Sequence, residues 1–214
     1  IEDACQAIGA RDMHGAKLGQ NARVSCLSFY PTKNLGAAGD AGALVTRDEK
    51  LAQRLYQTRQ HGETSRYHHE FVGGNFRMDA LQAAVLNVKL RYLERWTAQR
   101  QAIAAYYTQR FAGTEVRAPK VIPGNFHVFH QYIIRVPQRD SLRDYLAKEG
   151  IGCNIFYPKC LHLQACFADL GYKQGDFPQA ERATTEVLAL PIYPELTEAQ
   201  MARVADAILR FYKK

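Results

Sequence analysis

The spacing of apolar residues predicts short strands and one helix in the first part of the chain. The apolar run at residues 24–29 predicts a buried strand, and residues 43–46 predict a second strand after a turn-rich segment. Asp48 is placed to cap a helix that runs toward Gln60. Residues 63–77 are polar and aromatic and contain two adjacent glycines, which favours a loop.

A long amphipathic helix is predicted from Met78 onward. It continues, with a break, through Phe111 and is ended by Gly113. The apolar residues that recur at helical spacing are Leu81, Ala84, Val85, Val88, Leu90 and Leu93.

The pattern after the Pro119–Gly124 linker alternates between strands and helices. Thr197 followed by Gln200 matches a capping box at the start of the last helix. This alternation favours a second, smaller α/β domain over residues 116–214, after a first domain over residues 1–115. The predicted elements are a strand at 127–136, a helix at 139–149 ended by Gly150, a strand at 151–156, a helix from about Pro178 and a helix at 197–211.

Composition excludes several classes of protein. Hydrophobic residues make up 47% of the 214 residues and charged residues 23%, which is typical of a globular chain rather than a disordered or fibrous one. No apolar run approaches the roughly 20 residues that a membrane helix needs, and no signal peptide is visible. We therefore expect a soluble, cytoplasmic protein.

The cysteines favour reduced thiols. Their number, 5, is odd, and they are scattered without a Cys-x-x-Cys pair, as in cytosolic proteins. Cys160, His162 and Cys166 lie close together, but their spacing matches no zinc pattern, so no metal is expected.

The formal charge of +7 raises the question of nucleic-acid binding. The basic residues contain no dense run and are spread along predicted helices, which favours a solvated helix face over a nucleic-acid surface. A phosphorylated small substrate would also suit a basic site. Examples of these residues are Lys89, Arg91, Arg95 and Arg100.

The first residues read as the end of a strand in the middle of a fold. The sequence has no starting Met and opens on Ile1-Glu2-Asp3-Ala4. We expect that a large amino-terminal portion is absent from this sequence.

The segment SFYPTKNLG, residues 28–36, places Lys33 in a turn directly after a predicted buried strand. Desolvation in such a pocket lowers the pKa of an amine, and a neutral amine is what imine formation requires. A surface lysine in a turn is the alternative for an isolated residue.

Asp3 lies upstream, at the end of a predicted strand. A carboxylate there is suited to pair with a protonated pyridine nitrogen, which makes a pyridoxal ring an electron sink. A helix cap is the alternative for Asp3 alone.

Taken together, the chain resembles the DegT/DnrJ/EryC1/StrS family of aminotransferases over nearly its whole length. Six segments in the family's order carry the resemblance, which makes it specific. They are IEDACQAIGA (1–10), SFYPTKNLGAAGDAGALVT (28–46), GGNFRMDALQAAVL (73–86), HQYIIR (130–135), FYPKCLHLQ (156–164) and LPIYPELTEAQ (190–200).

The resemblance implies an α/β, fold-type I, pyridoxal-5′-phosphate-dependent transferase. The chain would hold part of the large mixed-sheet domain plus the smaller carboxy-terminal domain. Lys33 matches the lysine that bonds the cofactor and shuttles the proton, and Asp3 matches the partner of the ring nitrogen. Gln6 matches a residue near the ring hydroxyl, and Ser28 a phosphate ligand. Asn75 matches an asparagine that reaches the phosphate from the neighbouring subunit, which implies a homodimer with a shared active site.

Substrate contacts are implied less directly. Arg77 is a fixed cation suited to the diphosphate of a nucleotide-sugar, or to a surface ion pair. Tyr157 matches the second residue of a His-Tyr-Pro pattern, but here Phe156 replaces the histidine and removes its hydrogen bond. His162 either lines the same region or packs within a loop.

These matches predict an enzyme that moves an amino group from an amino acid, such as L-glutamate, to a keto group of a nucleotide-linked sugar, with a preference for C3. Its role would be amino-sugar biosynthesis, for instance for a surface polysaccharide. Family dehydratases carry histidine in place of the lysine, so Lys33 favours the aminotransferase branch. The alternatives are a keto-cyclitol aminotransferase and a non-catalytic homologue that serves as a binding module.

Overall fold

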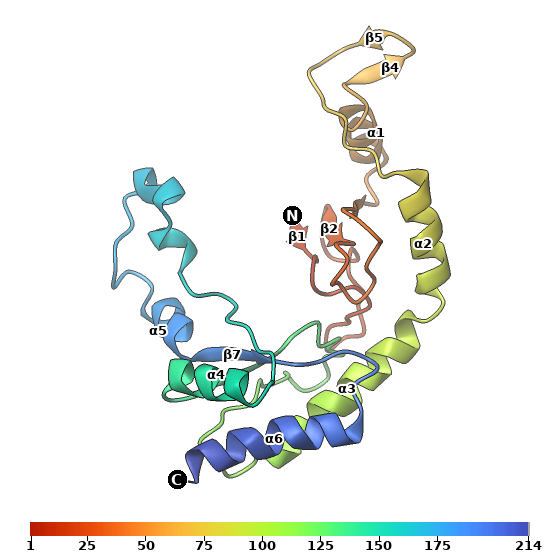
Figure 1. Ribbon diagram of the computed structural model, residues 1–214. Coiled ribbons are helices and arrows are strands. Elements are labelled where there is room, and N and C mark those ends of the chain that lie inside the picture. Colours follow the sequence, from red (N-terminus) through yellow and green to blue (C-terminus); the bar gives the residue numbers. More distant parts are fainter. Residues whose placement is uncertain (214) are drawn as a thin grey trace. The chain divides into compact units, whose positions relative to one another are not determined.

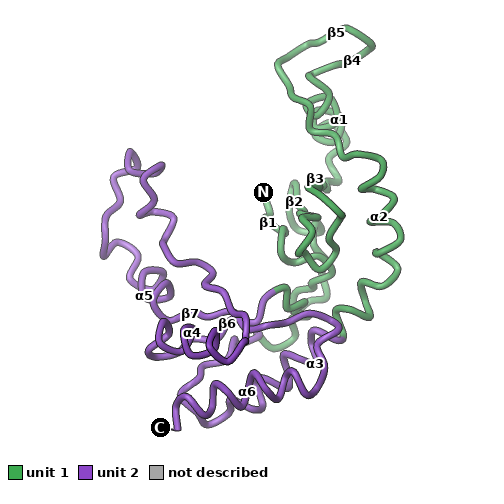
Figure 2. Tube along the Cα trace, viewed as in Figure 1, with its two compact units in different colours: residues 1–98, 122–130 green, residues 99–121, 131–214 purple. Residues whose placement is uncertain are grey.

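The computed structural model describes residues 1–213 and separates them into two compact units (Figure 2). The first unit holds residues 1–98 and 122–130, and the second holds residues 99–121 and those from 131 onward. Helix α3 (Leu93–Arg110) contributes residues to both. In the described part of the chain, no helix combines the length and apolar character required to cross a membrane.

A three-stranded sheet with the order β1-β2-β3 lies in the first unit (β1 and β2 are labelled in Figure 1, and all three strands in Figure 2). Strand β1 (Glu2–Asp3) runs parallel to β2 (Ser25–Ser28), and β2 runs antiparallel to β3 (Gly42–Val45). The strands predicted at 24–29 and 43–46 are confirmed within one residue at each end. Sheet pairing is possible here because the turn-rich segment between β2 and β3 reverses the chain.

Helix α1 (Glu49–Thr58) begins as predicted. The Asp48 side chain accepts a hydrogen bond from the Leu51 N–H at 3.0 Å and caps the helix. The prediction of a simple loop at 63–77 is wrong in part, because β4 (Glu63–Ser65) and β5 (His68–His69) form a short antiparallel hairpin.

Helix α2 (Ala80–Leu90) is separated from α3 by two residues, so the predicted break is confirmed. Most of the predicted apolar stripe is not the buried face, since Leu81 is 81% exposed and Val88 is 56% exposed. Leu93, the last residue of that stripe, does join the core of the first unit, as does Leu86, which the stripe did not include. The other buried members of that core are Phe29, Leu35 and Ala37.

The second unit pairs β6 (Tyr132–Arg135) with β7 (Val187–Leu190) in an antiparallel ladder. Helix α5 (Pro178–Glu186) precedes β7, and α6 (Glu198–Tyr212) begins with the predicted capping box at Thr197. The remaining elements are α4 (Arg139–Lys148), η1 (Leu161–Leu163) and η2 (Ala165–Leu170).

Two strand predictions in the second half are corrected. Residues 127–131 do not extend β6, and residues 151–156 form no strand. Asn154 makes only an isolated bridge to Ala189. A strand needs a neighbour along its whole length, and β7, which supplies that neighbour for β6, spans only four residues.

The core of the second unit is aromatic where α3 meets β6. The rings of Tyr107 and Tyr132 lie 5.3 Å apart, and both are fully buried. Each phenol has a partner, since Tyr107 donates to the Pro191 carbonyl and Tyr132 pairs with the Thr108 hydroxyl. Burial raises the pKa of Tyr132, and the hydrogen bond to Thr108 works against that rise.

Candidate functional site

The carboxyl ends of the parallel strands β1 and β2 meet at one edge of the sheet. Asp3 ends β1 opposite Cys26, and Ser28 ends β2 two residues later. Paired residues and residues two apart share a face of a sheet, so Asp3, Cys26 and Ser28 point the same way. Such strand ends are where open α/β sheets bind ligands.

The pleat separates Asp3 from its neighbour Glu2. Glu2 faces the other side of the sheet, where its carboxylate accepts hydrogen bonds from the Ser25 hydroxyl and from the Gly19 N–H. These contacts fix Gly19, in the loop before β2, and Ser25, at the start of β2, to the Glu2 side chain, which therefore has a structural role. Asp3 remains exposed and is available to a ligand.

Hydrogen bonds keep Asp3 in its ionised form. Hydrogen bonding from Cys5, including the backbone N–H at 3.1 Å, keeps the pKa of Asp3 below its usual range, and the positive charge of Lys33 adds to this. The hydrogen bond with Asp3 also raises the pKa of the Cys5 thiol, and burial raises it further. The structure thus brings Asp3 and Lys33, predicted separately from the sequence, within electrostatic reach.

A tight turn fixes the backbone at Lys33. The Lys33 N–H donates to the Tyr30 carbonyl at 2.8 Å, and the Ala37 N–H donates to the Phe29 carbonyl at 2.8 Å. Only glycine fits at position 36, because a Cβ there would lie 2.3 Å from the Pro31 carbonyl oxygen. Lys33 itself is half-buried.

Helix α2 supports this turn through polar side chains. The Lys89 ammonium donates to the Gly36 carbonyl, and the Gln82 amide oxygen accepts from the Ala38 N–H at 2.8 Å. Gln82, Leu86 and Lys89 follow helical spacing and therefore share one face of α2. Leu86 packs in the core cluster that contains Leu35, so the turn is held from both sides.

Asn34, which sequence reasoning did not select as a site residue, links the turn to residues 128–130. Its side chain is buried and donates to the Val128 carbonyl at 2.9 Å, while its amide oxygen lies 3.3 Å from Nδ1 of His130. A polar residue directly after Lys33, and the histidine in HQYIIR, were the signals that could have indicated this pair.

We expect replacement of Asn34 by alanine to destabilise the protein by about 1–3 kcal/mol, because the Val128 carbonyl is left without its buried donor. Urea unfolding measures the change, with Asn21→Ala, an exposed loop position, as the control. Equal unfolding free energies for the two variants would contradict the assignment.

Three other predicted residues of the first unit lie at the surface. Gln6 is exposed and follows the turn in which the Ala7 N–H donates to the Ala4 carbonyl. Asn75 and Arg77 are exposed and bond to each other, with the Arg77 Nε–H donating to Asn75 Oδ1 at 2.9 Å. Among residues 1–213, no hydrogen bond or ion pair joins these three to Lys33 or Asp3.

The two predicted substrate residues of the second unit differ in their surroundings. Tyr157 is 62% exposed and lines a pocket together with Phe156. His162 is packed: Nε2 lies 3.0 Å from Glu181 Oε1, and its ring lies 4.7 Å from that of Phe177 at an interplanar angle of 58°. Desolvation by burial raises the pKa of Glu181. Hydrogen bonds from the Gly175 and Phe177 N–H groups and from His162 outweigh this effect and hold that pKa below its usual range.

The first unit thus carries a carboxylate and a hydroxyl at the ends of β1 and β2, and an amine in the turn that follows β2. The Ser28 oxygen accepts from the Tyr30 N–H at 3.3 Å, and its own proton stays available to an anion. The amine is able to bond an aldehyde, the carboxylate to pair with a protonated ring nitrogen, and the hydroxyl to bind a phosphate.

Comparison with protein families identifies one match over almost the whole chain. The model of the DegT/DnrJ/EryC1/StrS aminotransferase family matches residues 1–209.

The chain is also similar to individual proteins. A protein of Geobacillus stearothermophilus named "Pleiotropic regulatory protein" is 47% identical over 100% of this chain and 58% of its own length. The dTDP-3-amino-3,4,6-trideoxy-alpha-D-glucose transaminase of Streptomyces venezuelae is 42% identical over 97% of this chain and 55% of its own length. The crystal structure of S. venezuelae DesV in complex with a ketimine intermediate superposes with a TM-score of 0.94 at 40% identity, covering 99% of this chain and 57% of that one.

Proposed function

The chain belongs to the DegT/DnrJ/EryC1/StrS aminotransferase family, and from this membership we propose that it is the part of a sugar aminotransferase that contains the cofactor-bonding lysine. The proposed reaction moves an amino group from L-glutamate to the C3 keto group of a nucleotide-linked sugar. The chain spans 58% of the Geobacillus relative and 55% of the Streptomyces one, so the proposal concerns the whole protein. The observation that supports it is the placement of Asp3 and Ser28 at the carboxyl ends of two paired parallel strands, with Lys33 in the tight turn that follows the second strand.

The residues present fit pyridoxal 5′-phosphate, on which this family depends. Asp3 and Ser28 share one face at the end of the parallel strands, and Lys33 lies in the turn that follows Ser28. Opposite Ser28, β3 carries Gly42, where a Cβ would lie 2.9 Å from the Leu27 carbonyl oxygen. When bound, the cofactor supplies an aldehyde that exchanges amino groups and a ring that accepts an electron pair.

In this proposal, each side chain has one task. The Lys33 amine would hold the cofactor and later move the proton at the reacting carbon. The Asp3 carboxylate would keep a proton on the ring nitrogen, and hydrogen bonding from Cys5 keeps Asp3 ionised for this task. Ser28 would bind the phosphate, and Gln6 would lie near the ring hydroxyl.

The remaining residues extend the proposal to a shared active site. Asn75 is exposed, as a residue must be to reach the phosphate of a neighbouring copy, and we propose a homodimer on this basis. Arg77 would pair with the diphosphate of the sugar nucleotide, and Tyr157 and His162 would serve the substrate side. Residues 1–115 would form the remainder of the cofactor domain, and residues 116–214 the small domain.

We assign this activity to amino-sugar biosynthesis in the cytoplasm. Each of the five cysteines occurs as a free thiol in the described residues, which suits a reducing compartment.

A spectroscopic and kinetic assay of the purified protein tests the proposal. We expect a near-visible absorbance band after addition of pyridoxal 5′-phosphate, bleached by borohydride, and L-glutamate-dependent amination of dTDP- or UDP-linked 3-keto sugars. Turnover of a free keto-cyclitol in place of the nucleotide-sugars would identify the cyclitol alternative. A colourless protein that does not change on addition of cofactor would favour a binding module, an alternative kept because the Geobacillus relative is named as a regulatory protein.

A further inference from the structure

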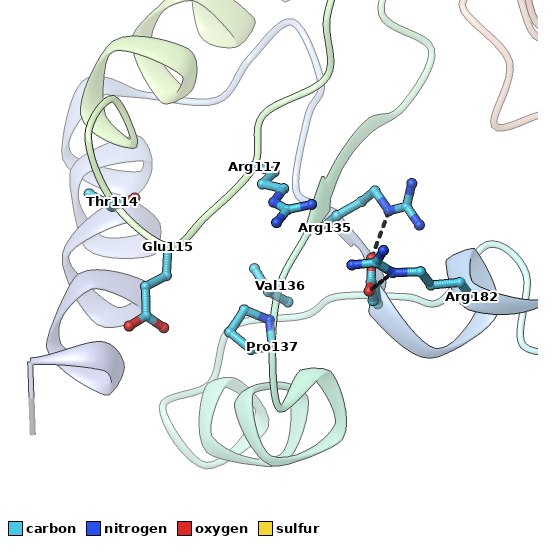
Figure 3. A pocket seen from close by; sticks show the side chains of 8 residues that line it. Thr114, Glu115, Arg117, Arg135, Val136, Pro137 and Arg182 are labelled. Atoms are coloured by element: carbon cyan, nitrogen blue, oxygen red, sulfur yellow. Dashed lines mark hydrogen bonds and ion pairs between the residues drawn. The ribbon is translucent and has the colours of Figure 1, made fainter. Parts of the chain in front are cut away.

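A pocket of about 410 Å³ in the second unit is lined by three arginines (Figure 3). Arg117 and Arg135 come from two chain segments that pair, and Arg182 comes from α5. The volume is within the range of small-molecule sites in proteins. The other lining residues are Thr114, Glu115, Val136, Pro137 and Glu186.

Backbone pairing forces two of these positive charges together. The Arg117 N–H donates to the Arg135 carbonyl at 3.0 Å, and the Arg135 N–H donates back to the Arg117 carbonyl at 2.9 Å. Residues that exchange both hydrogen bonds face each other with their side chains on one side of the ladder. Like charges directly opposite each other are unfavourable, so a nearby negative charge would stabilise this arrangement.

Glu186 supplies only part of that negative charge. Its Oε2 lies 3.0 Å from Arg135 Nε and its Oε1 lies 2.5 Å from Arg182 Nε, as the dashed lines in Figure 3 show. The hydrogen bond from Arg182 is the main cause that holds the pKa of Glu186 below its usual range. A single carboxylate is thus shared between two guanidinium groups.

Donors for a further anion remain in the pocket. Nη2 of Arg135 is buried and has no hydrogen-bond partner in the described residues. The Arg117 side chain makes no hydrogen bond or ion pair with any residue of the described chain, and in Figure 3 it extends into the pocket. Buried polar groups in proteins are nearly always paired, and guanidinium groups pair best with planar or tetrahedral oxyanions.

We propose that this arginine pocket binds the oxyanion group of a small metabolite, a phosphate or a carboxylate. Arg117 and the free Nη2 of Arg135 would contact the anion, while Glu186 holds Arg135 and Arg182 in place. The inference rests on residues of the second unit and does not depend on the proposed amino transfer.

Isothermal titration at constant ionic strength tests the site, with inorganic phosphate and succinate as separate probes. The protein is first loaded with pyridoxal 5′-phosphate and then freed of unbound cofactor by gel filtration, because the proposed cofactor site would itself take a phosphate and unbound cofactor would compete at the arginine pocket. We expect binding of one of the probes, weakened about tenfold or more in Arg117→Gln, where a charge-assisted pair is lost. Arg182→Gln should weaken binding less, because it acts through Glu186.

The matched control is Arg143→Gln, which removes an arginine of the same unit that pairs with Asp144 on the surface of α4. It should bind the probe as the wild type does. Circular dichroism checks folding, and Arg117→Lys, which keeps the charge, should recover part of the affinity. Equal affinity in the wild type and Arg117→Gln, or no binding of either probe to the wild type, would overturn the proposal.

Discussion

Replacement of Lys33 by alanine is expected to lower amino transfer by at least about 10³-fold, since proton transfer by a positioned side chain alone contributes about 10²–10⁴-fold. The variant also loses the only lysine in the turn at residues 30–37. Treatment with cofactor and then borohydride should no longer leave the cofactor covalently attached to the protein. The measurement is kcat/KM with L-glutamate and a nucleotide-linked 3-keto sugar, together with mass spectrometry of the reduced protein.

Lys50→Ala is the matched control for this result. Lys50 is an exposed lysine in the first turn of α1, and its loss should leave both the adduct and the rate unchanged. Because Lys33 is only half-buried and is not a member of the core cluster, the unfolding free energy of Lys33→Ala should stay close to that of the wild type. Full activity of Lys33→Ala would remove the basis of the proposed function.

The sequence was sufficient to predict the elements around the site. The strand at 25–28, the turn that holds Lys33 and the capped helix α1 are each specified by neighbouring residues, through apolar runs, glycines and a capping aspartate. The capping box at Thr197 is a local signal of the same kind. Such features depend on contacts a few residues apart, which a single sequence displays directly.

Features that depend on distant partners were missed. The strand predicted at 151–156 fails because only Asn154 meets β7, more than thirty residues later in the chain. The buried face of α2 includes the polar Gln82 and Lys89, which form hydrogen bonds with the backbone of the Lys33 turn. The spacing of apolar residues therefore predicted the wrong face of α2 as the buried one. Asn34 is another such residue, because the buried hydrogen bond that its side chain donates goes to the Val128 carbonyl, 94 positions away in the sequence.

The same distinction applies to the candidate site. Lys33 and Asp3 were selected for their chemistry and by resemblance, and the register of β1 with β2 then placed Asp3 on the strand next to the one that leads into the Lys33 turn. The arginine pocket had no such signal, because Arg117, Arg135 and Arg182 are ordinary surface cations until the second unit folds. Their grouping is a property of β6, α5 and the bridge between residues 117 and 135.

Replacement of Asp3 by asparagine is the second large expected effect. We expect kcat/KM to fall about 10²–10³-fold, the usual loss when one preorganised electrostatic group is removed from an active site. Asparagine keeps the size of the side chain and an oxygen that accepts the Cys5 N–H, so the turn at residues 3–5 should be retained. What is lost is the negative charge that would keep a proton on the ring nitrogen of the cofactor.

The pH dependence gives this prediction a sign. Hydrogen bonding from Cys5 lowers the pKa of Asp3, so the carboxylate stays ionised through neutral pH and its contribution disappears only as the pH falls through that lowered pKa. The rate ratio between wild type and Asp3→Asn should therefore be constant near neutrality and shrink only in acid. Asp12→Asn is a matched control, because Asp12 Oδ1 accepts the His14 N–H at 2.9 Å in a similar turn. Its rate should equal that of the wild type, and an equal loss in both variants would show that the turn, rather than the charge of Asp3, is what the reaction requires.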